Sequence, residues 1–124
     1  MTLSELLKEL RWVDRDVYET LRNYPIYCSV GEALTVNLLD SSNQILVEDA
    51  IQCSIQRAIE QREWDLRQDQ WVIKQDGPND VHHYATIEKG IAETGEPFEY
   101  EGWGKSQAEA LLAAYVAAVK EEKR

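Results

Sequence analysis

The chain has 124 residues, of which 44% are hydrophobic, and its 23 acidic residues outnumber 13 lysine and arginine residues to give a net charge of −10. This length suits a single domain that buries its own core without metals or disulfides, and the apolar content excludes a disordered chain. No apolar run reaches the length of a membrane span, and the acidic balance disfavours direct binding to nucleic acid, which requires a basic surface.

The N-terminal residues and the two cysteines bear on the cellular compartment. Residues 1–11 lack the basic and then apolar layout of a signal peptide, and their acidic residues argue against a transit peptide. Cys28 and Cys53 lie 25 residues apart without a spacing motif, so they either pair or remain free thiols in a reducing cytosol. We favour free thiols and a cytoplasmic location.

The first predicted element is an N-terminal helix. Thr2 and Glu5 form a capping box, and apolar residues follow at helical spacing until Pro25 ends the helix, because the residue before a proline avoids the helical region. The stripe consists of Leu3, Leu6, Leu7, Leu10, Val13, Val17 and Leu21. Trp12 and Tyr18 lie beside this stripe, where they either widen the buried face or meet a partner.

Two short strands and a central helix are predicted next. Residues 26–30 and 34–38 alternate between apolar and polar side chains, and residues 40–43 form a turn cluster. Residues 44–47 are ambiguous, because they fit either the return strand of a hairpin or the first turn of a helix. Beyond them, apolar residues recur at helical spacing and predict a helix over about 46–63.

The rhythm then changes to period two, which is typical of strands. Strands are predicted over 71–75, 81–88 and 98–103, with a turn between the first two and a loop over 90–97. Because the connecting segments are short, we expect an antiparallel meander.

The last predicted element is a helix over 106–120. Ser106 and Glu109 form its capping box. Its apolar stripe consists of Ala108, Leu111, Leu112, Tyr115, Val116 and Val119. The sequence therefore predicts a single domain over 1–124 of the α+β class. A three- to five-stranded, mainly antiparallel sheet would pack with N-terminal, central and C-terminal helices. Residues 1–45 would supply the first helix and a hairpin, and residues 46–124 a unit of a helix, three strands and a helix.

Several stretches resemble the phage ABA sandwich domain family. They are the end of the central helix at 58–64, the strands at 71–73 and 84–87, and above all the entry into the last helix at 102–114. The resemblance covers residues 47–119. It implies a small protein of phage or prophage type without an established activity, and it carries over no catalytic residues.

Histidine and cysteine offer the chemistry that a catalytic or metal site would use. His82 and His83 are adjacent, so on a strand they point to opposite faces, which is poor geometry for a metal. A nucleophile pair of Cys28 or Cys53 with His83 would have to form in space, and nothing around either cysteine supports it. We therefore expect no enzyme, no cofactor and no metal site.

The most promising surface is acidic. Between residues 76 and 109, eight acidic residues accompany only Lys89 and Lys105. Glu99, Glu101 and Trp103 share one strand face, with Glu96 just before the strand. Acidic side chains around an aromatic anchor suit a basic protein partner. Equally, these residues fit the solvated side of a sheet whose other face carries Phe98 and Tyr100.

We therefore expect a small acidic non-enzymatic protein that binds another protein. The resemblance implies a phage-type modulator or inhibitor of a host factor. The alternative is a small-molecule or nucleotide-signal binding protein with a site between subunits, for which Arg57, Arg62, Arg67 and Lys105 are candidates. A homo-oligomer is compatible with the apolar surface of the N-terminal helix.

Overall fold

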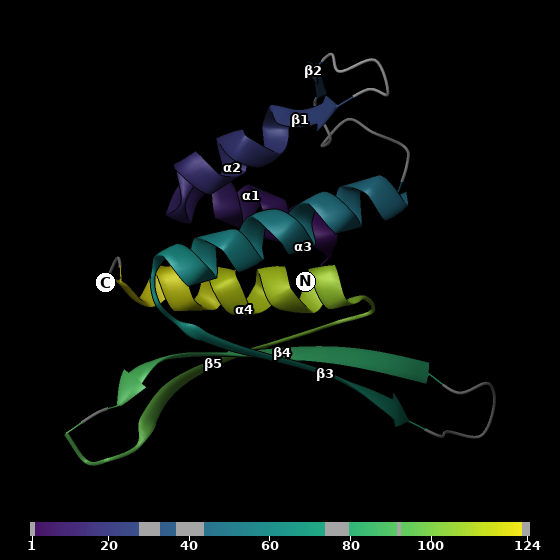
Figure 1. Ribbon diagram of the computed structural model, residues 1–124. Coiled ribbons are helices and arrows are strands. Elements are labelled where there is room, and N and C mark those ends of the chain that lie inside the picture. Colours follow the sequence, from purple (N-terminus) through teal and green to yellow (C-terminus); the bar gives the residue numbers. More distant parts are fainter. Residues whose placement is uncertain (1, 28–32, 37–43, 74–79, 92, 123–124) are drawn as a thin grey trace.

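The computed structural model describes residues 2–27, 33–36, 44–73, 80–91 and 93–122. Within these ranges the chain forms α1 (Leu3–Val13), α2 (Arg15–Arg22), β1 (Tyr24–Tyr27), β2 (Ala33–Val36), α3 (Gln44–Gln61), β3 (Asp65–Ile73), β4 (Asp80–Ile91), β5 (Pro97–Gly104) and α4 (Gln107–Glu122), as Figure 1 shows. None of the helices in these ranges is both long enough and apolar enough to cross a bilayer.

The elements are stacked in layers on one side of a three-stranded sheet. The strand order is β3-β4-β5, with antiparallel pairing throughout. Helix α4 lies along one face of this sheet, and α1 and α3 pack against α4 from the other side (Figure 1). The predicted α+β arrangement, with N-terminal, central and C-terminal helices around an antiparallel sheet, is confirmed.

Helix α4 is the centre of the core, as its apolar stripe predicted. Nine of its residues are buried, and the Tyr115 side chain is wholly enclosed. The Ser106 hydroxyl accepts a hydrogen bond from the Glu109 amide at 3.1 Å, which caps the start of the helix. Gly102 of β5 lies directly against the α4 backbone, since a Cβ atom there would overlap Ala110 and Ala114. The absence of a side chain at this glycine lets helix and strand approach closely.

The single N-terminal helix predicted from the apolar stripe is wrong, because the helix breaks at Asp14. This residue has φ −149° and ψ 82°, outside the helical region. Its carboxylate accepts a hydrogen bond from the Val17 amide at 3.3 Å and so begins α2. Leu10 and Leu21, on either side of the break, are nevertheless both buried. The apolar stripe therefore predicted correctly which side chains are buried, but it did not predict the change in helix direction at Asp14.

The ends of other elements also differ from the prediction. Residues 44–47 belong to α3, which resolves their ambiguity in favour of the helix. Strand β3 begins at Asp65 rather than at residue 71, because pairing with β4 holds a polar segment extended. Strand β4 continues to Ile91 through an irregularity after Glu88, so the predicted loop over 90–97 is shorter. The predicted turns at 40–43 and 75–80 lie largely outside the described residues.

The two N-terminal strands do not join the main sheet. Strands β1 and β2 pair antiparallel with each other as a separate two-stranded sheet, in which Tyr24 lies opposite Val36. They lie at the end of α2 that is remote from the three-stranded sheet (Figure 1). The main sheet therefore has the lowest strand number of the predicted range.

Candidate functional site

One face of the three-stranded sheet is open. In Figure 1 the helices all lie on the opposite side, and no element of the described ranges covers this surface, which we call the outer face. Ala85 and Ile87 of β4 are fully buried towards α4. Because side chains alternate along a strand, Tyr84, Thr86 and Glu88 belong to the outer face.

The pairing register brings three carboxylates into one row across the outer face. Asp65 of β3 lies opposite Glu88 of β4, and Glu88 lies opposite Glu99 of β5. Like charges directly opposite one another on neighbouring strands are destabilising. This acid row (Asp65, Glu88 and Glu99) is therefore a cost to the fold that a cation bound between the strands would relieve.

A recess adjoins the acid row. It has a volume of about 220 Å³ and is lined by Asp65, Leu66, Arg67, Thr86 and Glu88. Thr86 is only 2% exposed, which places it at the bottom of this part of the surface. Among the described residues, the outer face carries one cationic side chain, Arg67, and four acidic ones. The acidic residues are those of the acid row and Glu101, so the net charge of this surface is negative.

An aromatic pair lies at the other end of the outer face. Tyr84 and Trp103 are opposite one another in register, and their ring centroids are 5.2 Å apart at an interplanar angle of 32°. Trp103 remains 52% exposed. A half-exposed indole supported by a second ring offers a rigid apolar contact to a partner.

The predicted site residues are thus partly brought together. Glu99, Glu101 and Trp103 alternate along the outer face of β5, as the sequence indicated. Glu96 lies instead in the exposed turn before β5, at the opposite end of the strand from Trp103. The sequence analysis missed Asp65 and Glu88, whose place beside Glu99 depends on the register of the sheet. Counting residues outwards from the β4–β5 turn would have placed Glu88 opposite Tyr100, because the irregularity between Glu88 and Ile91 shifts the register by one residue.

A groove lies beside the C-terminal end of β5. It has a volume of about 220 Å³ and is lined by Leu6 of α1, Trp103 of β5, and Ala113, Val116, Ala117 and Lys120 of α4. We call it the α1–β5 groove. Two alanines leave the space open because their side chains are short. At one end, Lys120 forms an ion pair with Glu9 at 3.4 Å. Trp103 is the one residue of the described sheet in its lining, which places the groove where the last residues of β5 meet α1 and α4.

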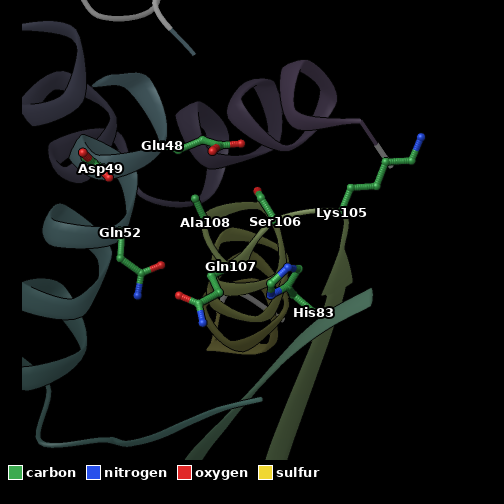
Figure 2. A pocket seen from close by; sticks show the side chains of 8 residues that line it. All are labelled: Glu48, Asp49, Gln52, His83, Lys105, Ser106, Gln107 and Ala108. Carbon is green, nitrogen blue, oxygen red and sulfur yellow. The ribbon is translucent and has the colours of Figure 1, made fainter. Parts of the chain in front are cut away.

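A third pocket lies at the start of α4 (Figure 2). It has a volume of about 410 Å³ and is lined by Glu48, Asp49, Gln52, His83, Lys105, Ser106, Gln107 and Ala108. Gln52 and Gln107 lie on facing helices, while Lys105 extends away from the pocket (Figure 2). The buried His83 Nδ1 has no hydrogen-bond partner among the described residues.

Metal and nucleophile chemistry gain no support from the described ranges. No group of three potential metal ligands lies together there. Cys53 is an exposed thiol on α3, and it does not line the pocket of His83. Cys28 lies outside the described residues.

The four cations considered for a nucleotide site are dispersed. Arg62 forms ion pairs with Glu122 at 2.8 Å and Asp14 at 3.5 Å. Arg67 belongs to the outer face, and Lys105 follows the end of β5. Arg57 is exposed on α3, where its guanidinium is 4.0 Å from the thiol of the neighbouring turn. Within one chain these residues do not form a common phosphate site.

A buried polar cluster joins the helices to the sheet. The Tyr115 hydroxyl donates to Asp14, and burial, with the neighbouring carboxylate, raises the pKa of Tyr115. Lys89 of β4 donates to the Ala118 carbonyl, and its ammonium lies 4.7 Å from the ring centres of both Trp64 and Tyr100. Burial lowers the pKa of Lys89. This cluster holds the elements together.

Comparison with protein-family models, curated protein sequences and solved structures gave no significant match.

Proposed function

We propose that this chain is a non-enzymatic binding protein that captures a basic segment of another protein on the outer face of its sheet. The observation that carries the proposal is the acid row at one end of the outer face together with the Tyr84–Trp103 pair at the other end, where Trp103 is exposed. Opposite charges steer a basic partner to the surface, and an aromatic residue in the contact supplies binding energy after docking. The recess beside Asp65 and Glu88 has room for the end of a lysine or arginine side chain.

The chemistry of the outer face argues against a second copy of the chain as its occupant. In a symmetric dimer the same patch faces itself. Two outer faces, each with four acids against Arg67, would then meet in a protein whose net charge is already −10. A basic partner removes this repulsion. The resemblance to the phage ABA sandwich family would make that partner a host factor and this chain its modulator or inhibitor.

A charge-reversal titration tests the proposal. The probe is an end-blocked hexapeptide of alternating lysine and valine, and the affinity is measured by calorimetry at low and at physiological salt. Glu99→Lys with Glu101→Lys should weaken binding by at least about tenfold, because each basic contact becomes repulsive. The matched control, Asp49→Lys with Glu60→Lys, makes the same charge change at exposed positions of α3 and should have a much smaller effect. Equal losses in both variants would mean that the peptide responds to net charge alone and would contradict the proposal.

A further inference from the structure

Strand β5 has an open edge. It is the last strand in the order β3-β4-β5, and within the described ranges β4 is its only paired neighbour. The amide and carbonyl groups along its other edge therefore make no sheet hydrogen bonds to the described chain. Such an edge can accept an extended segment of another protein as an additional strand.

The α1–β5 groove lies beside the C-terminal end of this edge, at Trp103. Gly102 lets α4 sit directly on β5, and the groove occupies the space beyond, between α4 and Leu6 of α1. Ala113 and Ala117 are half-buried and form its wall on the α4 side. A second pocket, of about 550 Å³, lies one helical turn further along both helices. It is lined by Thr2, Leu3, Glu5, Lys105 and Glu109. A strand added to β5 would thus find apolar space in the α1–β5 groove, whereas the second pocket is lined mostly by polar and charged residues.

The two sides of the added strand would meet different surroundings. Side chains of a strand alternate between the faces of a sheet. On the outer face, the neighbours across from the added strand are Glu99 and Glu101, which favour basic residues. On the helix side, the neighbours are Leu6, Ala113 and Ala117, which favour small or medium apolar residues. The complementary segment therefore alternates basic and apolar residues.

We propose that the partner binds by strand addition: an extended segment with alternating basic and apolar residues pairs with the open edge of β5. Its basic side chains lie beside Glu99 and Glu101, and its apolar side chains enter the α1–β5 groove. The inference rests on the proposed function and specifies how the partner is held. A second copy of β5 is a poor occupant, because its own Glu99 and Glu101 would lie beside these carboxylates.

Backbone N-methylation tests the strand pairing itself. In an extended alternating lysine–valine hexapeptide, the amides of the lysines point to one edge and those of the valines to the other. Two peptides are compared with the unmodified one, methylated on the lysine amides or on the valine amides. One should bind as the unmodified peptide does, and the other should lose at least about tenfold in affinity. If both bind equally, or both fail, strand addition is contradicted.

A groove variant separates this inference from the proposed function. Ala117→Gln introduces another good helix former, but its longer side chain fills the groove. The affinity for the unmodified peptide should therefore fall by at least about tenfold. Glu60→Gln, at an exposed position of α3 outside the groove, is the control and should bind normally. Circular dichroism first shows that Ala117→Gln is folded. If this variant then binds the peptide normally while the charge reversal at Glu99 and Glu101 abolishes binding, capture of a basic partner is supported and strand addition is contradicted. If neither variant affects binding, both proposals fail. A dimer in sedimentation that Ala117→Gln dissociates would make a second copy the occupant and would also overturn the inference.

Discussion

The hydroxyl of Tyr115 donates a hydrogen bond to the carboxylate of Asp14, with the two oxygens 2.5 Å apart across 101 residues of sequence. Asp14 is the residue at which the N-terminal helix breaks, and Tyr115 lies wholly buried in α4. The contact therefore connects the turn between α1 and α2 to the centre of the core. The guanidinium of Arg62 approaches the same carboxylate at 3.5 Å.

Removing the Tyr115 hydroxyl tests how much this contact stabilises the fold. Tyr115→Phe keeps the buried ring and leaves Asp14 with Val17 and Arg62 as partners. We expect a loss of about 1 to 2 kcal/mol in the free energy of unfolding, measured by urea denaturation, because a buried hydrogen bond to a charged group disappears. Tyr18→Phe removes the hydroxyl of a half-buried ring on α2 and is the control, with a loss below about 0.5 kcal/mol. Equal effects would show that the hydrogen bond to Asp14 contributes nothing particular.

The alkaline pH dependence of stability should carry the signature of Tyr115. Its pKa is raised in the folded state, so above the unfolded pKa, about 10, the unfolded chain loses a proton that the folded chain keeps. Stability contributed by Tyr115 is thus present below that pH and falls as the pH rises, by up to about 1.4 kcal/mol per pH unit. Lys89 acts in the opposite sense, because its pKa is lowered on folding and its unfavourable contribution fades with rising pH.

The difference between the wild-type chain and Tyr115→Phe isolates the tyrosine, since Lys89 is common to both. Denaturation is measured between about pH 8 and about pH 11, a range that spans the unperturbed pKa values of tyrosine and lysine, about 10 and about 10.4. The free energies of unfolding of the wild-type chain and of Tyr115→Phe should converge as the pH rises. Parallel curves would mean that the phenol is not held in its neutral form by the fold.

Gly102 offers a test of the packing between α4 and β5. A Cβ atom at this position would overlap backbone atoms of Ala110 and Ala114, which cannot rotate away. We expect Gly102→Ala to destabilise the chain by about 3 kcal/mol, the upper end of the range for overpacking. Gly95, with φ +87° and open space around it, is the control. Gly95→Ala should cost only about 1 kcal/mol, through backbone strain alone. Similar losses in the two variants, measured by thermal denaturation, would contradict the close approach.

Repulsion within the acid row should lower the free energy of unfolding of the unbound protein by a measurable amount. Glu88 lies between Asp65 and Glu99 in the sheet register, so neutralising it removes two like-charged neighbours at once. Glu88→Gln should therefore stabilise the fold by about 0.2 to 1 kcal/mol at low salt, and by less at high salt, where screening weakens the repulsion. Glu60→Gln, on the exposed side of α3, should change stability much less. If Glu88→Gln is destabilising, its carboxylate makes a favourable contact and the acid row does not store repulsion.

The sequence predicted those features that depend on local pattern. The capped helix after Ser106, its buried stripe and the alternation that puts Glu99, Glu101 and Trp103 on one face all follow from spacing within a few residues. What it missed depends on distant partners. The break at Asp14 lies inside an unbroken apolar stripe, and the buried phenol that supports it is more than a hundred residues away.

The start of β3 was missed for a similar reason. Residues 65–70 are mostly polar, and they are extended because the main chain pairs with β4, while Gln68 bonds Gln52 of α3 at 2.7 Å. Local composition gives no sign of that pairing. The acid row depends on it as well, since Asp65 meets Glu88 only once β3 begins there.

The most direct measurement is a peptide titration followed through the indole resonances of two tryptophans in a ¹⁵N spectrum. Trp103 and Trp12 are both exposed, at 52% and 82%, but Trp103 borders the outer face and Trp12 lies on α1. With the alternating lysine–valine peptide, the Trp103 resonance should shift in a saturable way while that of Trp12 stays in place. A shift of Trp12 alone, or of neither indole under conditions where calorimetry shows binding, would contradict capture of a basic segment by the outer face.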